Sequence, residues 1–239
     1  METYILNEES RIWTKRSGLG TIPVILISGG PGTENYMEPI AILFEEEFQV
    51  IQFDPAGTGR SPEGNQPYGL DEFIEDLEHI RHTHNLEKWW VVGHSWGADV
   101  ALAYSLTHPN SILGVISISG TGVQNDRDWK ADYIMNKEIQ GEQAPQFVYP
   151  VNQSVHRSLL ESWREFIKQP DLLKRISEIR LPILFLVAEK DIRPSWPIQQ
   201  LAALIPTSES KSIRGAGHYI WLQETLKLKN ALLNFIKSF

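Results

Sequence analysis

Several short runs of this chain are apolar at almost every position, and no other feature of the sequence restricts the fold as strongly. The runs cover residues 23–27, 50–53, 89–92, 112–118 and 181–188. Strands with one face in water alternate apolar and polar residues, whereas strands buried on both faces are apolar throughout. The sequence therefore predicts a parallel β-sheet that is covered by helices on both faces.

The segments between these runs complete the pattern. Two short segments, 4–6 and 11–14, flank the polar residues 7–10 and predict an opening β-hairpin. Apolar residues at helical spacing or runs of small residues predict helices at 37–46, 70–80, 98–106 and 221–236. A hairpin followed by alternating strands and helices indicates an α/β fold with one open, mostly parallel central sheet.

Residues 122–169 do not fit this alternation. They contain no apolar strand, carry Pro145 and Pro150, and show two polar helical patterns at 129–139 and 154–167. We expect this segment to form a small helical cap over the edge of the sheet where ligands bind. The predicted domain organisation is thus a core made of residues 1–121 and 170–239, with a cap at 122–169.

Charge and composition exclude several classes of protein. The 22 Lys and Arg residues against 30 Asp and Glu residues give a net charge of −8, which argues against nucleic acid as a partner and gives no reason to invoke anionic lipid. The chain has no cysteine, so disulfides, thiolate metal sites and a cysteine nucleophile are excluded. Residues 1–4 do not resemble the start of a signal peptide, and the apolar run at 181–188 is too short to span a membrane. We expect a cytoplasmic protein.

The pentapeptide Gly93-His94-Ser95-Trp96-Gly97 matches the G-x-S-x-G pattern in the context that this pattern requires. It follows the apolar run 89–92 and precedes a segment of small residues. A turn this tight from strand to helix needs small flanking residues, and it exposes the serine hydroxyl at a helix N-terminus. We therefore predict that Ser95 is a nucleophile; the alternative is an ordinary glycine turn with a helix-capping serine.

A serine nucleophile needs a base and an acid that orients the base, in the chain order serine, acid, histidine. His218 lies in the glycine-rich stretch Gly215-Ala216-Gly217 and is the predicted base. Asp191 directly follows the run 181–188 and is the predicted acid, because active sites of open α/β sheets form at the carboxyl ends of strands. The alternatives are that Asp191 caps a helix beginning near residue 195, or that Asp126 or Asp128 is the acid.

The negative oxygen that forms during acyl transfer needs N–H donors. Trp96, the residue after the nucleophile, offers one backbone N–H, and we expect Gly30 in Ser28-Gly29-Gly30-Pro31-Gly32 to offer the second. A glycine-rich loop can also hold a phosphate, but the segment lacks both the G-x-G-x-x-G and the P-loop pattern. The predicted chemistry requires no metal and no organic cofactor.

These motifs resemble those of the α/β-hydrolase superfamily. The resemblance rests on Gly29-Gly30-Pro31-Gly32, on Asp54, Gly57, Gly59 and Ser61, on the pentapeptide around Ser95, and on Ala101-Leu102-Ala103-Tyr104 with His108-Pro109. Within the superfamily the chain is most similar to the proline iminopeptidase-related branch. It departs from that branch at Ser28, at Pro55-Ala56, at His94 and in its short insertion.

The resemblance implies serine hydrolysis and only weakly implies a peptide substrate. Aminopeptidases of this branch hold the substrate's amine with glutamates of a large cap, and none of Glu138, Glu142, Glu161 and Glu165 aligns with those glutamates. Tryptophans 129, 163 and 196 are candidates for the wall of a substrate pocket. We expect cleavage of a small ester, amide or short peptide through an acyl-enzyme, carboxylesterase-like or proline iminopeptidase-like. The alternative is a ligand receptor or regulatory protein on the same fold, with slow turnover or none.

Overall fold

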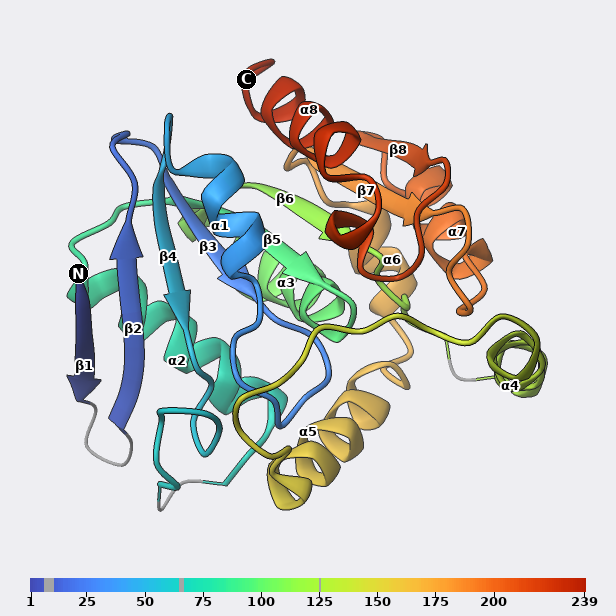
Figure 1. The fold of residues 1–239 in the computed structure, drawn as a ribbon, viewed down its shortest axis with the longest axis horizontal. Coiled ribbons are helices and arrows are strands. Elements are labelled where there is room, and N and C mark those ends of the chain that lie inside the picture. Colours follow the sequence, from blue (N-terminus) through green and yellow to red (C-terminus); the bar gives the residue numbers. More distant parts are fainter. Residues whose placement is uncertain (7–10, 65–66, 125) are drawn as a thin grey trace.

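The computed structural model describes residues 1–6, 11–64, 67–124 and 126–239 of the chain. Within these residues the strands form one eight-stranded sheet with the order β1-β2-β4-β3-β5-β6-β7-β8 (Figure 1). The strands are β1 Glu2–Leu6, β2 Arg11–Ser17, β3 Pro23–Ile27, β4 Gln49–Phe53, β5 Trp89–His94, β6 Ile112–Ile118, β7 Ile183–Ala188 and β8 Ser208–Ile213. The first two strands are antiparallel to their neighbours, and all other pairs are parallel. The predicted fold class is confirmed.

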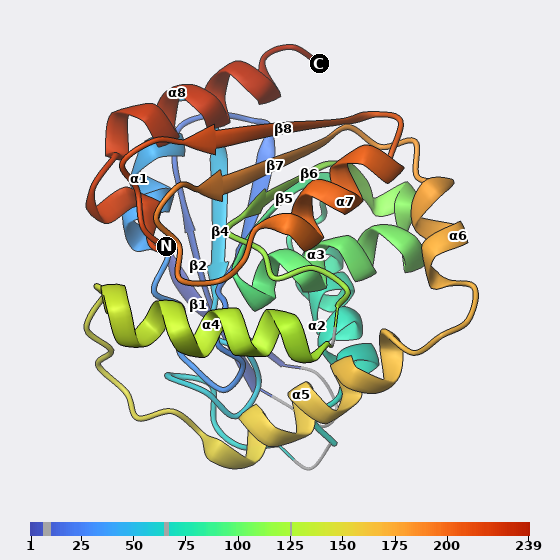
Figure 2. The ribbon, with the colours of Figure 1, turned by 90° about the vertical axis from the view of Figure 1, so that its right-hand side faces the viewer.

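Helices cover both faces of the sheet. They are α1 Glu38–Phe44, α2 Leu70–Thr83, α3 Trp96–Thr107, α4 Arg127–Gln140, α5 Gln153–Phe166, α6 Leu172–Ser177, α7 Trp196–Leu204 and α8 Thr225–Ile236, with 3-10 turns at Pro109–Ser111 and Ile220–Leu222. The apolar core accordingly has two layers. Buried residues of α1 and α8 pack on the strand face that contains Val24, and those of α2, α3 and α7 pack on the face that contains Ile25 (Figure 2).

Strands buried on both faces explain the apolar runs in the sequence. All residues of β4, β5 and β7 are buried. The edge strand β8 has the opposite character, since four of its six residues are exposed. The predicted opening hairpin is present as the antiparallel pair β1–β2, and its polar residues 7–10 lie outside the described residues. No described helix is long and apolar enough to cross a lipid bilayer.

The last helix differs from its prediction. The helical pattern at 221–236 is divided into the 3-10 turn Ile220–Leu222 and the helix α8, which begins only at Thr225. The side chains of Ile220 and Trp221 are both buried in the core layer of α8. At the break between the turn and α8, the Thr225 hydroxyl donates to the Trp221 carbonyl at 2.7 Å, so a side chain satisfies a carbonyl that a continuous helix would satisfy with a backbone N–H.

The strand order reverses around β3, which places the functional loops. β3 pairs with β4 on one side and with β5 on the other. The loop after β3 and the loop after β5 therefore leave the same sheet edge on either side of a switch point, where open α/β sheets form their crevice. The helices α4 and α5, at the two sequence positions where polar helices were predicted, lie beyond this edge of the sheet (Figures 1 and 2).

Candidate active site

Ser95 occupies the strained turn between β5 and α3. Its φ is 55° and its ψ is −127°, and residues other than glycine rarely adopt a positive φ. The turn is possible because Gly93 and Gly97 face each other: a Cβ on Gly93 would collide with the carbonyl of Gly97. The backbone N–H of Ser95 donates to the carbonyl of Ile118 at 2.8 Å and so anchors the turn to β6. Ser95 itself is 9% exposed and lines a cavity.

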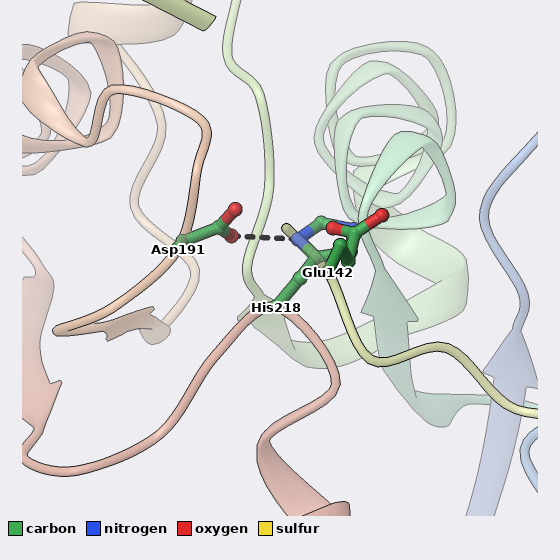
Figure 3. A group of neighbouring side chains, drawn as sticks. All are labelled: Glu142, Asp191 and His218. Atoms are coloured by element: carbon green, nitrogen blue, oxygen red, sulfur yellow. Dashed lines mark hydrogen bonds and ion pairs between the residues drawn. The ribbon is translucent and has the colours of Figure 1, made fainter. Parts of the chain in front are cut away.

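His218 and Asp191 form a close pair at the carboxyl ends of β7 and β8. The distance from His218 Nδ1 to Asp191 Oδ2 is 2.6 Å (Figure 3). Burial alone would raise the pKa of Asp191. The hydrogen bond from His218 and the charges of His218 and Arg193 outweigh burial, so the pKa of this carboxyl lies below its usual value. An ionised Asp191 holds the proton of His218 on Nδ1 and leaves Nε2 as the acceptor.

His218 lies against the residue that precedes Ser95. The ring centroids of His94 and His218 are 4.7 Å apart, and His94 Nε2 is 3.1 Å from the carbonyl oxygen of His218. Among the described residues no hydrogen bond joins the Ser95 hydroxyl to the His218 ring. Catalytic hydrogen bonds are often long before substrate binds. The structure thus brings all three predicted residues to one sheet edge, with Asp191 and His218 in direct contact.

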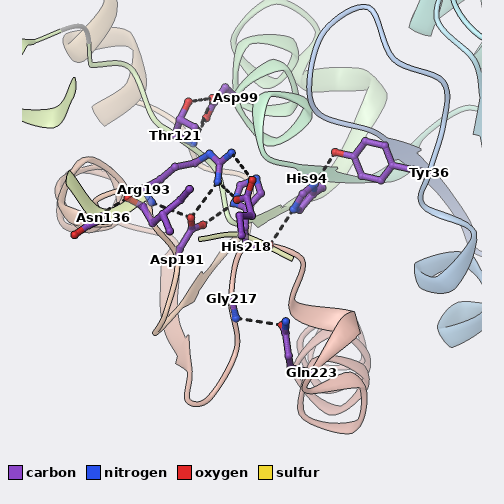
Figure 4. Close-up of polar contacts among 12 residues, drawn as sticks. Tyr36, His94, Asp99, Thr121, Asn136, Asp191, Arg193, Gly217, His218 and Gln223 are labelled. Atoms are coloured by element: carbon purple, nitrogen blue, oxygen red, sulfur yellow. Dashed lines mark hydrogen bonds and ion pairs between the residues drawn. The ribbon is translucent and has the colours of Figure 1, made fainter. Parts of the chain in front are cut away.

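A chain of hydrogen bonds runs behind the site from the loop after β3 to His218 (Figure 4). Burial, followed by the charge of His218, lowers the pKa of His94 far below its usual value, so His94 is neutral. Its Nε2–H donates to the His218 carbonyl, and its Nδ1 therefore accepts the hydroxyl proton of Tyr36 at 2.7 Å. The Tyr36 oxygen in turn accepts the N–H of Gly29 at 2.7 Å. This chain connects the loops of Gly30, Ser95 and His218, which are three of the four loops that carry the predicted site.

Arg193 connects Asp191 to the segment between α4 and α5. Its guanidinium lies 3.2 Å from Asp191 Oδ1 and also pairs with Glu142. Carboxylate oxygens of Glu142 and Asp191 and a ring nitrogen of His218 lie within 4.8 Å of one another, which is close enough for a metal site (Figure 3). However, both carboxylates already share the positive charge of Arg193, and His218 Nδ1 is bound to Asp191. This cluster is therefore suited to charge pairing and poorly suited to a cation.

Among the residues that the structure describes, no hydrogen bond uses the N–H of either predicted backbone donor. Trp96 is the first residue of α3, and the N–H of a first helical residue has no partner within its helix. Gly30 has a φ of 61°, and no hydrogen bond in the described part of the chain uses its N–H. The loop of Gly30 is fixed by α5, because His156 Nδ1 donates to the Pro31 carbonyl at 2.6 Å and the Asn152 N–H donates to the Gly32 carbonyl at 2.8 Å.

A cavity of about 610 Å³ lies between the sheet edge and the two polar helices. It is lined by Gly30, Pro31, Ser95, Trp96, Thr121, Gln124, Asp126, Trp129, Lys130, Tyr133, His156, Leu160, Trp163, Arg164, Ile167 and Arg193. Two of the three candidate wall tryptophans are present, and Trp196 is not. None of the four candidate glutamates lines it. Glu142 and His218 instead line a neighbouring cavity of about 440 Å³.

The alternative acids have other surroundings. Asp126 caps α4 by accepting the N–H of Trp129 at 2.6 Å, and Asp128 is exposed in the first turn of that helix. Sequence reasoning missed Tyr36, Arg193 and the pairing of Glu142 with Arg193. Arg193 could have been predicted from the sequence, because a cation two residues after the candidate acid Asp191 is close enough to pair with it. Tyr36 carries no local signal, because its partner His94 lies 58 residues away.

Comparison with known proteins agrees with this architecture. Residues 22–177 match the model of the alpha/beta hydrolase fold family. A putative carbamate hydrolase RutD of Escherichia coli strain 042 is 26% identical over 243 residues, which cover 90% of either chain. The structure resembles a thermophilic esterase from Thermogutta terrifontis (TM-score 0.80, 18% identity, 100% and 98% of the two chains). It also resembles a proline iminopeptidase from Mycobacterium smegmatis (TM-score 0.74, 14% identity, 100% and 98%). The predicted superfamily is confirmed: this chain belongs to the alpha/beta hydrolase fold family.

Proposed function

We propose that this protein is a serine hydrolase that cleaves a small ester or amide through an acyl-enzyme intermediate. The observation that carries the proposal is the strained turn at Ser95 together with the 2.6 Å pair of His218 and Asp191 at the same sheet edge. A serine with a strained backbone, flanked by glycines two residues away on either side, has no evident structural use. Residues 122–169, which supply α4 and α5, are proposed to act as a cap over the site.

In this proposal Ser95 Oγ attacks the carbonyl carbon of the substrate while His218 Nε2 takes the hydroxyl proton. The carbonyl electron pair moves to oxygen, where the N–H groups of Gly30 and Trp96 stabilise the negative charge. The intermediate collapses, and the leaving alcohol or amine takes the proton from His218. Water then attacks the acyl-enzyme in the same way and releases the acid and free Ser95. Asp191 orients the imidazole and stabilises its cationic form.

The cavity supports esters or simple amides better than peptides with a free N-terminus. A protonated amine needs an anionic partner, and Asp126 is the only carboxylate among the described lining residues. That carboxylate is used to cap α4. The relative from Escherichia coli is named a putative carbamate hydrolase, and a carbamate carbonyl would be attacked by the same steps.

Labelling and turnover test the proposal together. We expect a fluorophosphonate probe to label wild type and not Ser95→Ala. On an acyl nitrophenyl ester the variant should lose about 10³-fold or more in kcat. Ser105→Ala is the matched control, because Ser105 is a buried serine of α3, the helix that follows Ser95, and its hydroxyl donates to the Leu102 carbonyl. An N-terminal prolyl arylamide cleaved faster than the ester would assign the peptidase. Full turnover by Ser95→Ala would refute the mechanism.

One observation favours the alternative of a receptor or regulatory protein. The His218 side chain is only 1% exposed, and no hydrogen bond joins it to Ser95 among the described residues. A covered base is consistent with slow turnover. Rapid labelling of Ser95 with negligible repeated turnover on esters, arylamides and carbamates would support this alternative.

A further inference from the structure

We propose that the site selects substrates that carry a carboxylate away from the scissile bond, and that Lys130 and Arg164 bind this carboxylate. The inference rests on the proposed hydrolase function, because it assigns the substrate class of the cavity that Ser95 lines. It concerns residues of α4 and α5 that are remote from the Asp191–His218 pair in the sequence.

The cavity has a charge opposite to that of the whole protein. The chain carries a net charge of −8. Among the lining residues, however, three side chains are cationic at neutral pH and one is a carboxylate. The cations are Lys130, Arg164 and Arg193, and the carboxylate is Asp126. A concave site of one sign concentrates ligands of the other sign.

The three cations differ in their partners. Arg193 is paired with Asp191 and Glu142. Lys130 and Arg164 have no hydrogen bond or ion pair from their side chains to any described residue. A cation without a protein partner keeps its attraction for a ligand, whereas a paired one must first give up its partner.

The two unpaired cations come from different walls. Lys130 lies in the first half of α4 and Arg164 in the last turn of α5, and both line the cavity together with Ser95. Arg127 and Arg157 of the same two helices are also exposed and unpaired among the described residues, but they do not line the cavity. Lys130 and Arg164 differ from them in position, because both line the cavity together with Ser95.

Neutral groups that line the cavity also favour a ligand that accepts hydrogen bonds. Trp96 and Trp129 both line it, and the indole N–H of each has no hydrogen-bond acceptor among the described residues. An indole N–H can only donate. Cations and unpaired donors together fit a carboxylate and disfavour a free amine.

The matched substrates are 4-nitrophenyl hexanoate and mono-4-nitrophenyl adipate, which share a leaving group and chain length and differ by one terminal carboxylate. For wild type we expect kcat/KM to be about tenfold higher on the adipate ester. In Lys130→Gln/Arg164→Gln this preference should fall to within about twofold, because kcat/KM on the adipate ester drops relative to that on the hexanoate ester. Raising the ionic strength should weaken the preference.

Arg127→Gln/Arg157→Gln is the control, since it removes the same charge from exposed positions of the same two helices that do not line the cavity. It should keep the preference. If the control lost the preference as well, the effect would come from overall charge and the assignment of Lys130 and Arg164 would be wrong.

A second measurement separates this inference from the hydrolase function. Ser95→Ala should bind monomethyl adipate about tenfold more tightly than methyl hexanoate, measured by calorimetry. If wild type hydrolyses both nitrophenyl esters equally well and Ser95 is required, the proposed substrate class is wrong and the proposed hydrolase function stands. Preferred binding of monomethyl adipate without turnover of any ester would support the carboxylate site and remove the hydrolase.

Discussion

Tyr36 contributes to the candidate site without facing the cavity. Burial, followed by the charge of Tyr219, raises the pKa of Tyr36 well above its usual value, so its hydroxyl keeps its proton. That proton is donated to His94, and the oxygen accepts the N–H of Gly29. The residue before Ser95 and the loop of Gly30 thus share one side chain, which makes Tyr36 a positioning residue.

Tyr36→Phe should therefore lower kcat about tenfold and leave KM within about twofold, because it removes orientation and no substrate contact. The loss of two buried hydrogen bonds should also lower the free energy of unfolding by about 1–3 kcal/mol. Ester kinetics and urea unfolding measure the two effects. Tyr219→Phe is the control, because it removes a tyrosine hydroxyl from another ring that packs on His94. The ring centroids of Tyr219 and His94 are 5.0 Å apart. Reduced stability with an unchanged kcat would mean that Tyr36 is only structural.

At the scale of elements, the two polar helices are attached to the core in different ways. α5 buries Val155, Leu159, Trp163 and Phe166, whereas α4 has no buried residue. α4 is held by side-chain contacts such as Asn136 Nδ2 to the Ile192 carbonyl at 3.1 Å. Local stability follows buried apolar contact, so α5 is a fixed wall of the cavity and α4 is the wall that opens at lower cost.

The segment that leads from β6 into α4 is held by Asp99 of α3. This buried carboxylate accepts the N–H groups of Thr121 and Gly122 at 3.0 and 2.8 Å and also the Thr121 hydroxyl. Burial raises the pKa of Asp99 to about 7 in spite of these hydrogen bonds. An unfolded aspartate has a pKa of about 4, so between pH 4 and 7 the folded protein binds the extra proton.

Stability therefore falls as pH rises through this window, by at most about 1.4 kcal/mol per pH unit for one group. We expect the free energy of unfolding of wild type relative to Asp99→Asn to fall by about 1–4 kcal/mol between pH 4 and 8. Urea unfolding of both proteins across this range gives the difference. Asp128→Asn, which makes the same substitution at an exposed position of α4, is the control. A flat difference for Asp99→Asn would refute the assignment.

The elements also show what sequence could and could not predict. The central strands were predictable because burial on both faces leaves an apolar run, whereas the edge strand β8, Ser-Glu-Ser-Lys-Ser-Ile, leaves no such run. The strand–turn–helix at Ser95 was predictable because the turn demands glycine at fixed positions. The pair of Arg193 and Glu142 spans 51 residues, and no local pattern reports a contact over that distance.

At the scale of the whole molecule, one sheet joins the two core layers. The face under α1 and α8 and the face under α2, α3 and α7 are built from alternate residues of the same strands, such as Val24 and Ile25 of β3. Neither layer can lose its packing without exposing strands that the other layer needs. A chain built in this way should unfold in one cooperative step.

Leu232→Ala tests this cooperativity. Leu232 of α8 is fully buried, so its truncation should lower the free energy of unfolding by about 2–5 kcal/mol with an unchanged m-value. The core layer of α8 contains Trp90, and the other layer contains Trp89, so tryptophan fluorescence reports on both layers. If the two layers unfold together, fluorescence and far-ultraviolet circular dichroism should give the same midpoint. Leu226→Ala, at a position of α8 that is 76% exposed, should change stability by less than about 0.5 kcal/mol. Two separated midpoints in Leu232→Ala would show that the layer of α8 unfolds independently of the layer that contains α3.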